Sequence, residues 1–118
     1  MSLKVLIVDD AVIDRKNLER ILSGAGHRVL EAETGEQALE RARNDRPDLI
    51  LMDVNMPDLD GFATTRRLKA DAATRDIPVV FVTGKNQKAD IAWGRMLGAK
   101  GYVAKPYTPE QLLAQVDA

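Results

Sequence analysis

The sequence predicts an α/β fold: a five-stranded parallel sheet in the order 2-1-3-4-5, with helices on both faces and a strand-then-helix unit repeated five times. Three observations support this prediction. Short apolar runs alternate with amphipathic stretches along the whole chain, the strongest runs are rich in Val and Ile, and glycines and prolines separate many of the segments. Five such units form a parallel sheet with right-handed crossovers, and the doubly wound order makes strands one and three neighbours.

The five expected strands are three strong apolar runs and two weaker ones. The strong runs contain almost no polar residue, which is typical of parallel strands that are buried on both faces. In chain order the five runs are Val5–Val8, Val29–Leu30, Leu49–Met52, Val79–Val82 and Tyr102–Ala104.

Between the strands, apolar residues recur every three or four positions, as they do on one face of a helix. The five sets are Leu18, Ile21 and Leu22; Ala38, Leu39 and Ala42; Phe62, Thr65 and Leu68; Ala89, Trp93, Met96 and Leu97; and Leu112, Leu113 and Val116. Gly24 and Gly26 follow the first set, Pro47 follows the second, Gly98 follows the fourth, and Pro109 opens the fifth. These are residues that end or begin helices.

Composition limits the classes of function. With 118 residues, 45% of them hydrophobic, the chain can build one core, so we expect a single domain over residues 1–118 and no effector domain. The 17 Lys and Arg nearly balance the 18 Asp and Glu, which argues against direct binding to nucleic acid or to a membrane surface. Without Cys, a signal peptide or an apolar run of about 18 residues, the expected location is the cytoplasm.

Three acids stand at the ends of two strands that the predicted order makes neighbours. Asp9 and Asp10 follow the first strand, and Asp53 follows the third. Ligands bind at the carboxyl ends of such strands, and like charges in one cleft repel one another unless they share a cation. Ligation by oxygen alone suits Mg²⁺. Each acid by itself could be a helix cap, and Asp10 also stands where it could cap the following helix.

Two further polar groups reach the same edge of the predicted sheet. Lys105 ends the fifth strand and precedes Pro106, and the fourth strand closes with Thr83 and Gly84. The edge then carries a carboxylate nucleophile, cation ligands, a hydroxyl and a fixed positive charge. These are the parts that phosphoryl transfer needs, with Asp53, Lys105 and Thr83 as its catalytic residues.

Four motifs carry a resemblance that extends over the whole chain: VLIVDD, LILMDVNMPDLDG, VVFVTG and GYVAKP. Each motif is short, but their ordered set resembles the receiver domain of two-component response regulators, similar to CheY. The resemblance implies that Asp53 is phosphorylated by a sensor histidine kinase or a phosphotransfer protein. It also implies that Asp10, Asp53 and the backbone carbonyl of Asn55 ligate Mg²⁺, with Asp9 acting largely through metal-bound water.

The resemblance further implies a switch that controls a downstream target protein. Thr83 would move toward the phosphoryl group, and an aromatic residue on the fifth strand, here Tyr102, would rotate into the space. The responding surface would be the fourth helix, the fifth strand and the fifth helix. An ordinary half-buried Tyr explains the residue type equally well. A cis peptide bond between Lys105 and Pro106 is also implied.

Trp93 and Gly94, within the fourth helical pattern, resemble a subgroup of chemosensory regulators linked to pilus-driven twitching motility. A core-facing Trp beside a Gly that the helix tolerates is the interpretation that we favour from the sequence.

Two other classes of protein use related parts. A phosphate-ester hydrolase with an Asp nucleophile needs a second Asp two residues later, and here that position is Asn55, which cannot exchange protons. We therefore expect a regulatory phosphoacceptor that catalyses only its own phosphorylation and slow dephosphorylation. A flavodoxin-like cofactor carrier shares the topology, but Asp9 and Asp10 would repel a flavin phosphate.

Overall fold

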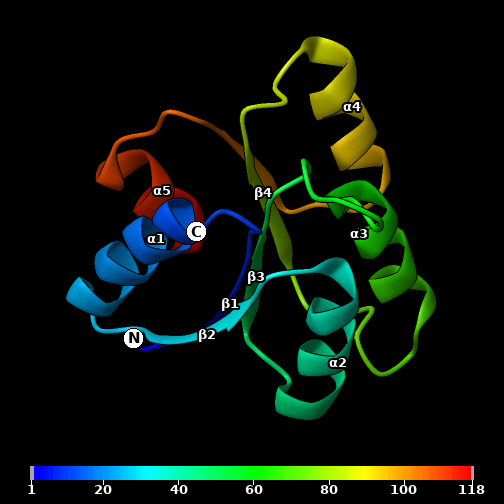
Figure 1. Cartoon of the computed structure of the whole chain (residues 1–118), viewed down its shortest axis with the longest axis horizontal. Coiled ribbons are helices and arrows are strands. Elements are labelled where there is room, and N and C mark those ends of the chain that lie inside the picture. The colour runs from blue at the N-terminus through cyan, green and yellow to red at the C-terminus, as the bar shows by residue number, and fades with distance from the viewer. Residues whose placement is uncertain (1, 118) are drawn as a thin grey trace.

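The computed structural model describes residues 2–117 and shows one parallel sheet between two layers of helices (Figure 1). The strands are β1 (Lys4–Val8), β2 (Arg28–Ala32), β3 (Leu49–Met52), β4 (Val79–Thr83) and β5 (Gly101–Ala104). The helices are α1 (Val12–Gly24), α2 (Gly35–Asp45), α3 (Gly61–Ala70), α4 (Lys88–Met96) and α5 (Pro109–Val116). All neighbouring strands pair in parallel in the order β2-β1-β3-β4-β5, so the predicted fold is confirmed.

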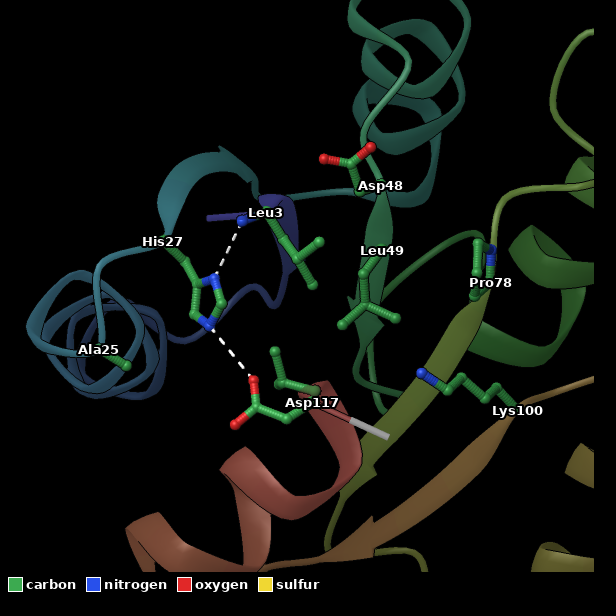
Figure 2. A pocket seen from close by; sticks show the side chains of 9 residues that line it. Leu3, Ala25, His27, Asp48, Leu49, Pro78, Lys100 and Asp117 are labelled. Carbon is green, nitrogen blue, oxygen red and sulfur yellow. Dashed lines mark hydrogen bonds and ion pairs between the residues drawn. The ribbon is translucent and has the colours of Figure 1, made fainter. Parts of the chain in front are cut away.

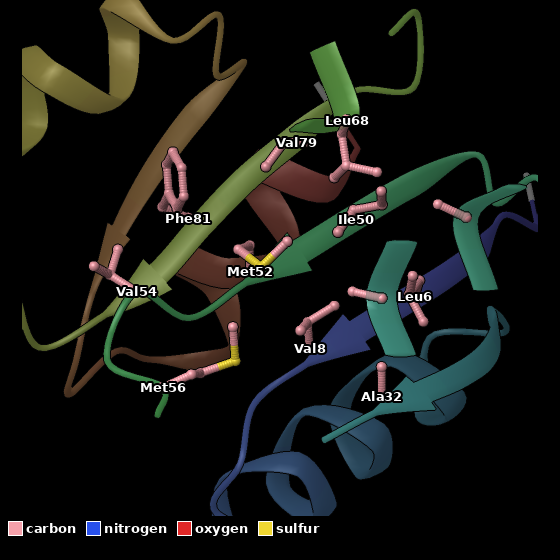
Figure 3. Close-up of a cluster of buried hydrophobic side chains, with 12 residues drawn as sticks. Leu6, Val8, Ala32, Ile50, Met52, Val54, Met56, Leu68, Val79 and Phe81 are labelled. Atoms are coloured by element: carbon pink, nitrogen blue, oxygen red, sulfur yellow. The ribbon is translucent and has the colours of Figure 1, made fainter. Parts of the chain in front are cut away.

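Side chains of β1 and β3 alternate between two hydrophobic clusters, one on each face of the sheet. Leu6 and Val8 belong to the cluster under α2 and α3, whereas Val5 and Ile7 belong to the cluster under α1 and α5. Figure 3 shows the first cluster, in which Phe81 of β4 lies beside the β3 side chains. Because both faces are covered, the central strands contain the uninterrupted apolar runs that the sequence shows.

Side-chain caps begin the two helices that follow β2 and β3. Thr34 accepts a hydrogen bond from the Gln37 amide at the start of α2, and Asp60 accepts one from the Ala63 amide at the start of α3. The N-cap of α1 is Ala11, which has no side-chain acceptor, so the expectation that Asp10 caps this helix is wrong. Within residues 2–117, no helix is both long and apolar enough to cross a bilayer.

Helix α4 corrects one interpretation of the sequence. Trp93 does not face the core: it is 38% exposed, and the only buried residue of α4 is Gly94. The Gly94 backbone packs on the aromatic rings of the sheet, since a Cβ there would lie 3.0 Å from Tyr102 Cε2 and 3.1 Å from Phe81 Cδ2. A Cβ at this position would force the rings to give way by a few tenths of an ångström, so Gly94 suits the close approach, and Trp93 lies on a different face of the helix that is open to solvent.

The edge of the sheet remote from the acids is closed by a buried histidine (Figure 2). His27 Nδ1 accepts a hydrogen bond from the Leu3 amide at 3.0 Å, and its Nε2 lies 3.6 Å from a carboxylate oxygen of Asp117. Asp48 accepts a hydrogen bond from the Lys4 amide at 2.8 Å on the same side. These contacts fasten the first strand and the end of α5 to the rest of the fold.

Candidate functional site

Three carboxylates meet at the carboxyl ends of β1 and β3. The register pairs Val8 with Met52, so the next residues, Asp9 and Asp53, come to lie side by side. One oxygen from each of Asp9, Asp10 and Asp53 lies within 4.8 Å of the others. Asp9 and Asp53 are buried and Asp10 is exposed, so the cluster is partly desolvated and still open to solvent on one side.

Backbone hydrogen bonds fix two of these acids. The Asp53 amide donates to the Val8 carbonyl at 2.9 Å, which continues the β1–β3 ladder by one step. Asp9 Oδ1 accepts from the Ala11 amide at 2.9 Å, and Asp53 Oδ1 accepts from the Asn55 amide at 3.3 Å. Each buried carboxylate therefore keeps its second oxygen directed to other partners. Asn55 itself is exposed beside Asp53.

Lys105 supplies the positive charge of the cluster. Its Nζ donates to Asp9 Oδ2 at 2.8 Å and to Asp14 Oδ2 at 3.1 Å, and it lies 3.5 Å from Asp53 Oδ2. The peptide bond between Lys105 and Pro106 is cis, and the Lys105 amide donates to the Thr83 carbonyl at 3.0 Å.

The pKa values of Asp9 and Lys105, which form an ion pair, are both shifted by their surroundings. Burial raises the pKa of Asp9, and the hydrogen bonds from Lys105 and Ala11 offset only part of that effect. Burial acts to lower the pKa of Lys105, but the hydrogen bond to Asp9 and the charge of Asp53 outweigh it, so this pKa is raised and the ammonium stays charged. The site thus contains a lysine that stays charged, beside a carboxylate whose charged form is disfavoured by burial.

Thr83 and Tyr102 are connected through the loop between β4 and α4. Thr83 is fully buried, and its Oγ1 accepts a hydrogen bond from the Lys85 amide at 3.2 Å. The Tyr102 hydroxyl donates to the carbonyl of the same Lys85. Its ring is tilted against Phe81 with 5.5 Å between ring centroids, and burial raises the pKa of Tyr102 to about 12. A movement of this loop would therefore change the hydrogen bonds of both side chains.

Two charged residues of α1 that the sequence reasoning passed over also belong to the site. Asp14 is the second acceptor of the Lys105 ammonium. Arg15 is buried, donates to the Asp9 carbonyl at 2.8 Å and forms ion pairs of 3.3 Å with Glu31 and with Glu33. A signal for Arg15 was present, because it precedes Leu18 at helical spacing and so occupies the buried stripe of α1.

The donor set fits a divalent cation. Three carboxylates bring their oxygens together without a nitrogen or sulfur ligand, and the single nearby ammonium does not neutralise all of them. Hard cations such as Mg²⁺ prefer oxygen ligands and keep several waters, and the exposed side at Asp10 leaves room for these.

An acidic cluster with one lysine at the switch point of a doubly wound sheet defines a class of domain that can take up a phosphoryl group on a carboxylate. A family model described as the response regulator receiver domain matches residues 5–117, and the chain belongs to this family. The family prediction made from the four motifs is confirmed, and with it a role in phosphoacceptor signalling.

Among curated relatives, Protein PilH of Pseudomonas aeruginosa is 44% identical over 115 residues, an alignment that covers 98% of this chain and 95% of PilH. Response regulator PleD of Caulobacter vibrioides is 40% identical over 116 residues, but the match covers 98% of this chain and only 26% of PleD. The chain therefore spans nearly all of one relative and about a quarter of the other.

Solved structures show the same likeness. The chemotaxis protein CheY4 of Vibrio cholerae superposes with a TM-score of 0.92 at 32% identity, covering 99% of this chain and 98% of that one. The receiver domain of sensor histidine kinase PA1611 from Pseudomonas aeruginosa superposes with a TM-score of 0.87 at 31% identity, covering 97% and 93%. That structure is described as having a magnesium ion coordinated in its active site cleft.

Proposed function

We propose that Asp53 accepts a phosphoryl group from a sensor histidine kinase or a phosphotransfer protein. The observation that carries the proposal is the position of Lys105, whose Nζ lies 3.5 Å from Asp53 Oδ2 while Asp9 and Asp14 hold it. A phosphoryl group attached to Asp53 would have a fixed positive charge within reach of its oxygens.

In this proposal the Asp53 carboxylate attacks phosphorus in line, the new bond from oxygen to phosphorus forms, and the bond to the donor breaks. Lys105 neutralises charge on the equatorial oxygens of the loose transition state. Asp9 keeps Lys105 in place through its hydrogen bond of 2.8 Å. Arg15 keeps the Asp9 backbone in place in turn. Positioning and electrostatics thus supply the rate enhancement.

We assign the cation site to Asp10, Asp53 and the backbone carbonyl of Asn55, with Asp9 nearby. A bound Mg²⁺ would neutralise carboxylate repulsion and stabilise negative charge on the transferred phosphoryl group. Asp9 is the less available ligand, because both of its oxygens already accept hydrogen bonds, from Ala11 and from Lys105.

Phosphorylation would change the conformation outside the site by way of Thr83. The Thr83 hydroxyl and the Tyr102 hydroxyl are both bonded to Lys85, so attraction of Thr83 toward new acceptor oxygens would disturb the anchor of Tyr102. Tyr102 lies under α4, which makes α4, β5 and α5 the surface that responds and controls a downstream target protein.

We further propose that the protein acts in the cytoplasm. Its sequence identity to PilH favours a role in a chemosensory pathway of the twitching-motility kind. Its catalysis would be limited to its own phosphorylation and slow dephosphorylation, since Asn55 cannot serve as an acid or base for rapid hydrolysis. Its organisation as one receiver domain stays a prediction.

The test is incubation with acetyl phosphate and Mg²⁺ followed by intact-mass measurement. We expect one phosphate adduct that is lost in alkali, as an acyl phosphate must be. Asp53→Asn should abolish the adduct. Asp58→Asn is the matched control, because Asp58 is an exposed acid in the next loop with a left-handed φ of 67° that Asn tolerates. An adduct that persists in Asp53→Asn, or none on the wild type, would refute the proposal.

A further inference from the structure

Arg15 is a buried cation directly behind the acidic cluster, and each of its three guanidinium nitrogens has a partner. Nη1 donates to the Asp9 carbonyl at 2.8 Å, Nε pairs with Glu31 at 3.3 Å, and Nη2 pairs with Glu33 at 3.3 Å. A guanidinium is planar and presents its donors in a fixed fork, so three partners in three directions define one orientation of the group. The Arg15 side chain is therefore firmly placed against the backbone of Asp9.

The contact with Asp9 acts on the peptide unit that joins the two consecutive acids, because the carbonyl that accepts from Arg15 lies between Asp9 and Asp10. A peptide unit is planar, so fixing its oxygen also fixes the direction in which the chain enters Asp10. On its other side, the Asp9 amide donates to the Ala32 carbonyl at 3.2 Å, and both carboxylate oxygens of Asp9 already have partners. Arg15 thus completes the fixation of Asp9 and sets where Asp10 begins.

Asp10 needs this support, because its side chain has none of its own. The carboxylate is exposed, and within residues 2–117 it makes no hydrogen bond or ion pair. It nevertheless supplies one of the three oxygens that lie within 4.8 Å of one another. A freely moving acid loses conformational entropy when it ligates a cation, so a backbone that already directs it into the cluster favours binding.

We propose that Arg15 is a positioning residue of the cation site. By holding the peptide unit between Asp9 and Asp10 it keeps the Asp10 carboxylate directed at the cluster, and so raises the affinity for Mg²⁺. Glu31 and Glu33 hold the guanidinium in turn, so the edge strand β2 and the loop after it support the site from a distance. The inference deepens the proposed function and rests on its assignment of the cation site.

The charge of Arg15 alone would have the opposite effect on the affinity for Mg²⁺. A guanidinium beside the acids repels a divalent cation, so its removal should strengthen binding if charge were all that mattered. The side chains of Glu31 and Glu33 are 45% and 63% exposed, so water can solvate both carboxylates when Arg15 is replaced. The direction of the change in affinity therefore separates positioning from electrostatics.

The test is calorimetric titration of the protein with MgCl₂, well below the melting temperature of each variant and with folding checked by circular dichroism. Arg15→Met should weaken Mg²⁺ binding about tenfold, as loss of a group that orients metal ligands does. Arg15→Lys keeps the charge but replaces the fork by one ammonium, so we expect binding that is weaker by about threefold or more. If only charge mattered, Arg15→Lys would bind like the wild type.

The matched control is Arg43→Met, which removes an ion pair of 2.9 Å between α2 and Asp71 and should leave the affinity for Mg²⁺ within about twofold of the wild type. A purely structural role of Arg15 would lower the melting temperature of Arg15→Met without changing the affinity of the folded protein. Unchanged or tighter binding by Arg15→Met would overturn the inference, as would an equal loss with Arg43→Met or no Mg²⁺ binding by the wild type. Should Arg15→Met fail to fold, wild-type affinity in Arg15→Lys would overturn it.

Acetyl phosphate separates this inference from the proposed function. The Mg²⁺ concentration that gives half-maximal adduct formation should rise in Arg15→Met by the same factor as the dissociation constant. If the wild type gains the adduct but the Arg15 variants bind Mg²⁺ as tightly as it does, the positioning inference fails and the phosphoacceptor stands. If no adduct forms although Arg15→Met and Arg15→Lys bind Mg²⁺ more weakly, the phosphoacceptor proposal fails and the positioning role stands.

Discussion

Gly61 is the point at which the fold allows least change near the phosphoacceptor. A Cβ at this first residue of α3 would lie 2.1 Å from the Asp53 carbonyl oxygen and 2.8 Å from Val54 Cα. Both neighbours are backbone atoms, so no side-chain rotation can relieve the clash. Gly61→Ala must therefore push α3 away from the end of β3 or displace Asp53 itself.

The cost can be estimated from the two opposing effects. Overpacking typically costs about 1–3 kcal/mol, and a clash with backbone belongs at the upper end of that range. Ala in a helix recovers at most about 1 kcal/mol relative to Gly. A net loss of about 2 kcal/mol lowers the melting temperature of a chain this size by roughly 8 °C. Displacement of Asp53 should also slow phosphate uptake, by as much as about a hundredfold for a shift near 1 Å.

The assay is thermal unfolding followed by circular dichroism, together with the rate of adduct formation from acetyl phosphate. Gly24→Ala is the matched control, since a Cβ at the last residue of α1 meets nothing within 4 Å. That change should raise the melting temperature by roughly 2 °C, through lower entropy of the unfolded chain. A Gly61→Ala protein that melts and phosphorylates like the wild type would show that the reasoning from backbone contact is wrong.

Three further predictions concern charge. Asp9→Asn in magnesium-free buffer should raise the melting temperature at neutral pH, because the raised pKa of Asp9 means that its charged form destabilises the fold. The gain in melting temperature should shrink as pH falls through that pKa, and a gain that does not depend on pH would contradict this reasoning. Asp14→Asn should raise the phosphorylation rate by acetyl phosphate about two- to fivefold, since it removes an anion that partly neutralises Lys105 while Asp9 still holds that ammonium, and Asp14→Glu should leave the rate unchanged. Burial, with the charge of Asp90, raises the pKa of Tyr102 from its ordinary value of 10.0 to about 12. The stability of the wild type in urea should therefore fall as the pH rises from 10.0 to about 12, and Tyr102→Phe should lack that part of the decline.

The strand order and the acidic cluster were accessible from the sequence for a physical reason. Parallel strands that are buried on both faces must be apolar throughout, so the runs ending before Asp9 and Asp53 stand out, and the doubly wound order then fixes which strand ends are neighbours. The positions of these acids follow from backbone topology alone. No side-chain conformation had to be known.

The partners of Lys105 could not be obtained in the same way. A lysine has a long flexible stem, and the sequence says which edge of the sheet it reaches but not which anions it contacts there. Asp14 lies on α1 one turn beyond the acidic pair, where an exposed helix acid is common, and only the tertiary fold brings it to 3.1 Å from Lys105 Nζ. Arg15 differs, because its place in the buried stripe of α1 could have been recognised from the helical period.

Helix α4 shows why an apolar period alone does not say which way a helix faces. The stripe through Ala89, Trp93 and Met96 has the spacing of a core-facing helix, and a burial argument would turn it toward the sheet. The rings of Phe81 and Tyr102, however, lie between α4 and the sheet, and the backbone of Gly94 packs closely against them. In this chain α4 therefore packs on the sheet through the backbone of Gly94 and keeps Trp93 and Met96 exposed. On that reasoning Gly94→Leu should displace α4 and lower the free energy of unfolding by about 1–3 kcal/mol, as overpacking does, and an unchanged melting temperature would show that α4 is held in place by something other than this contact.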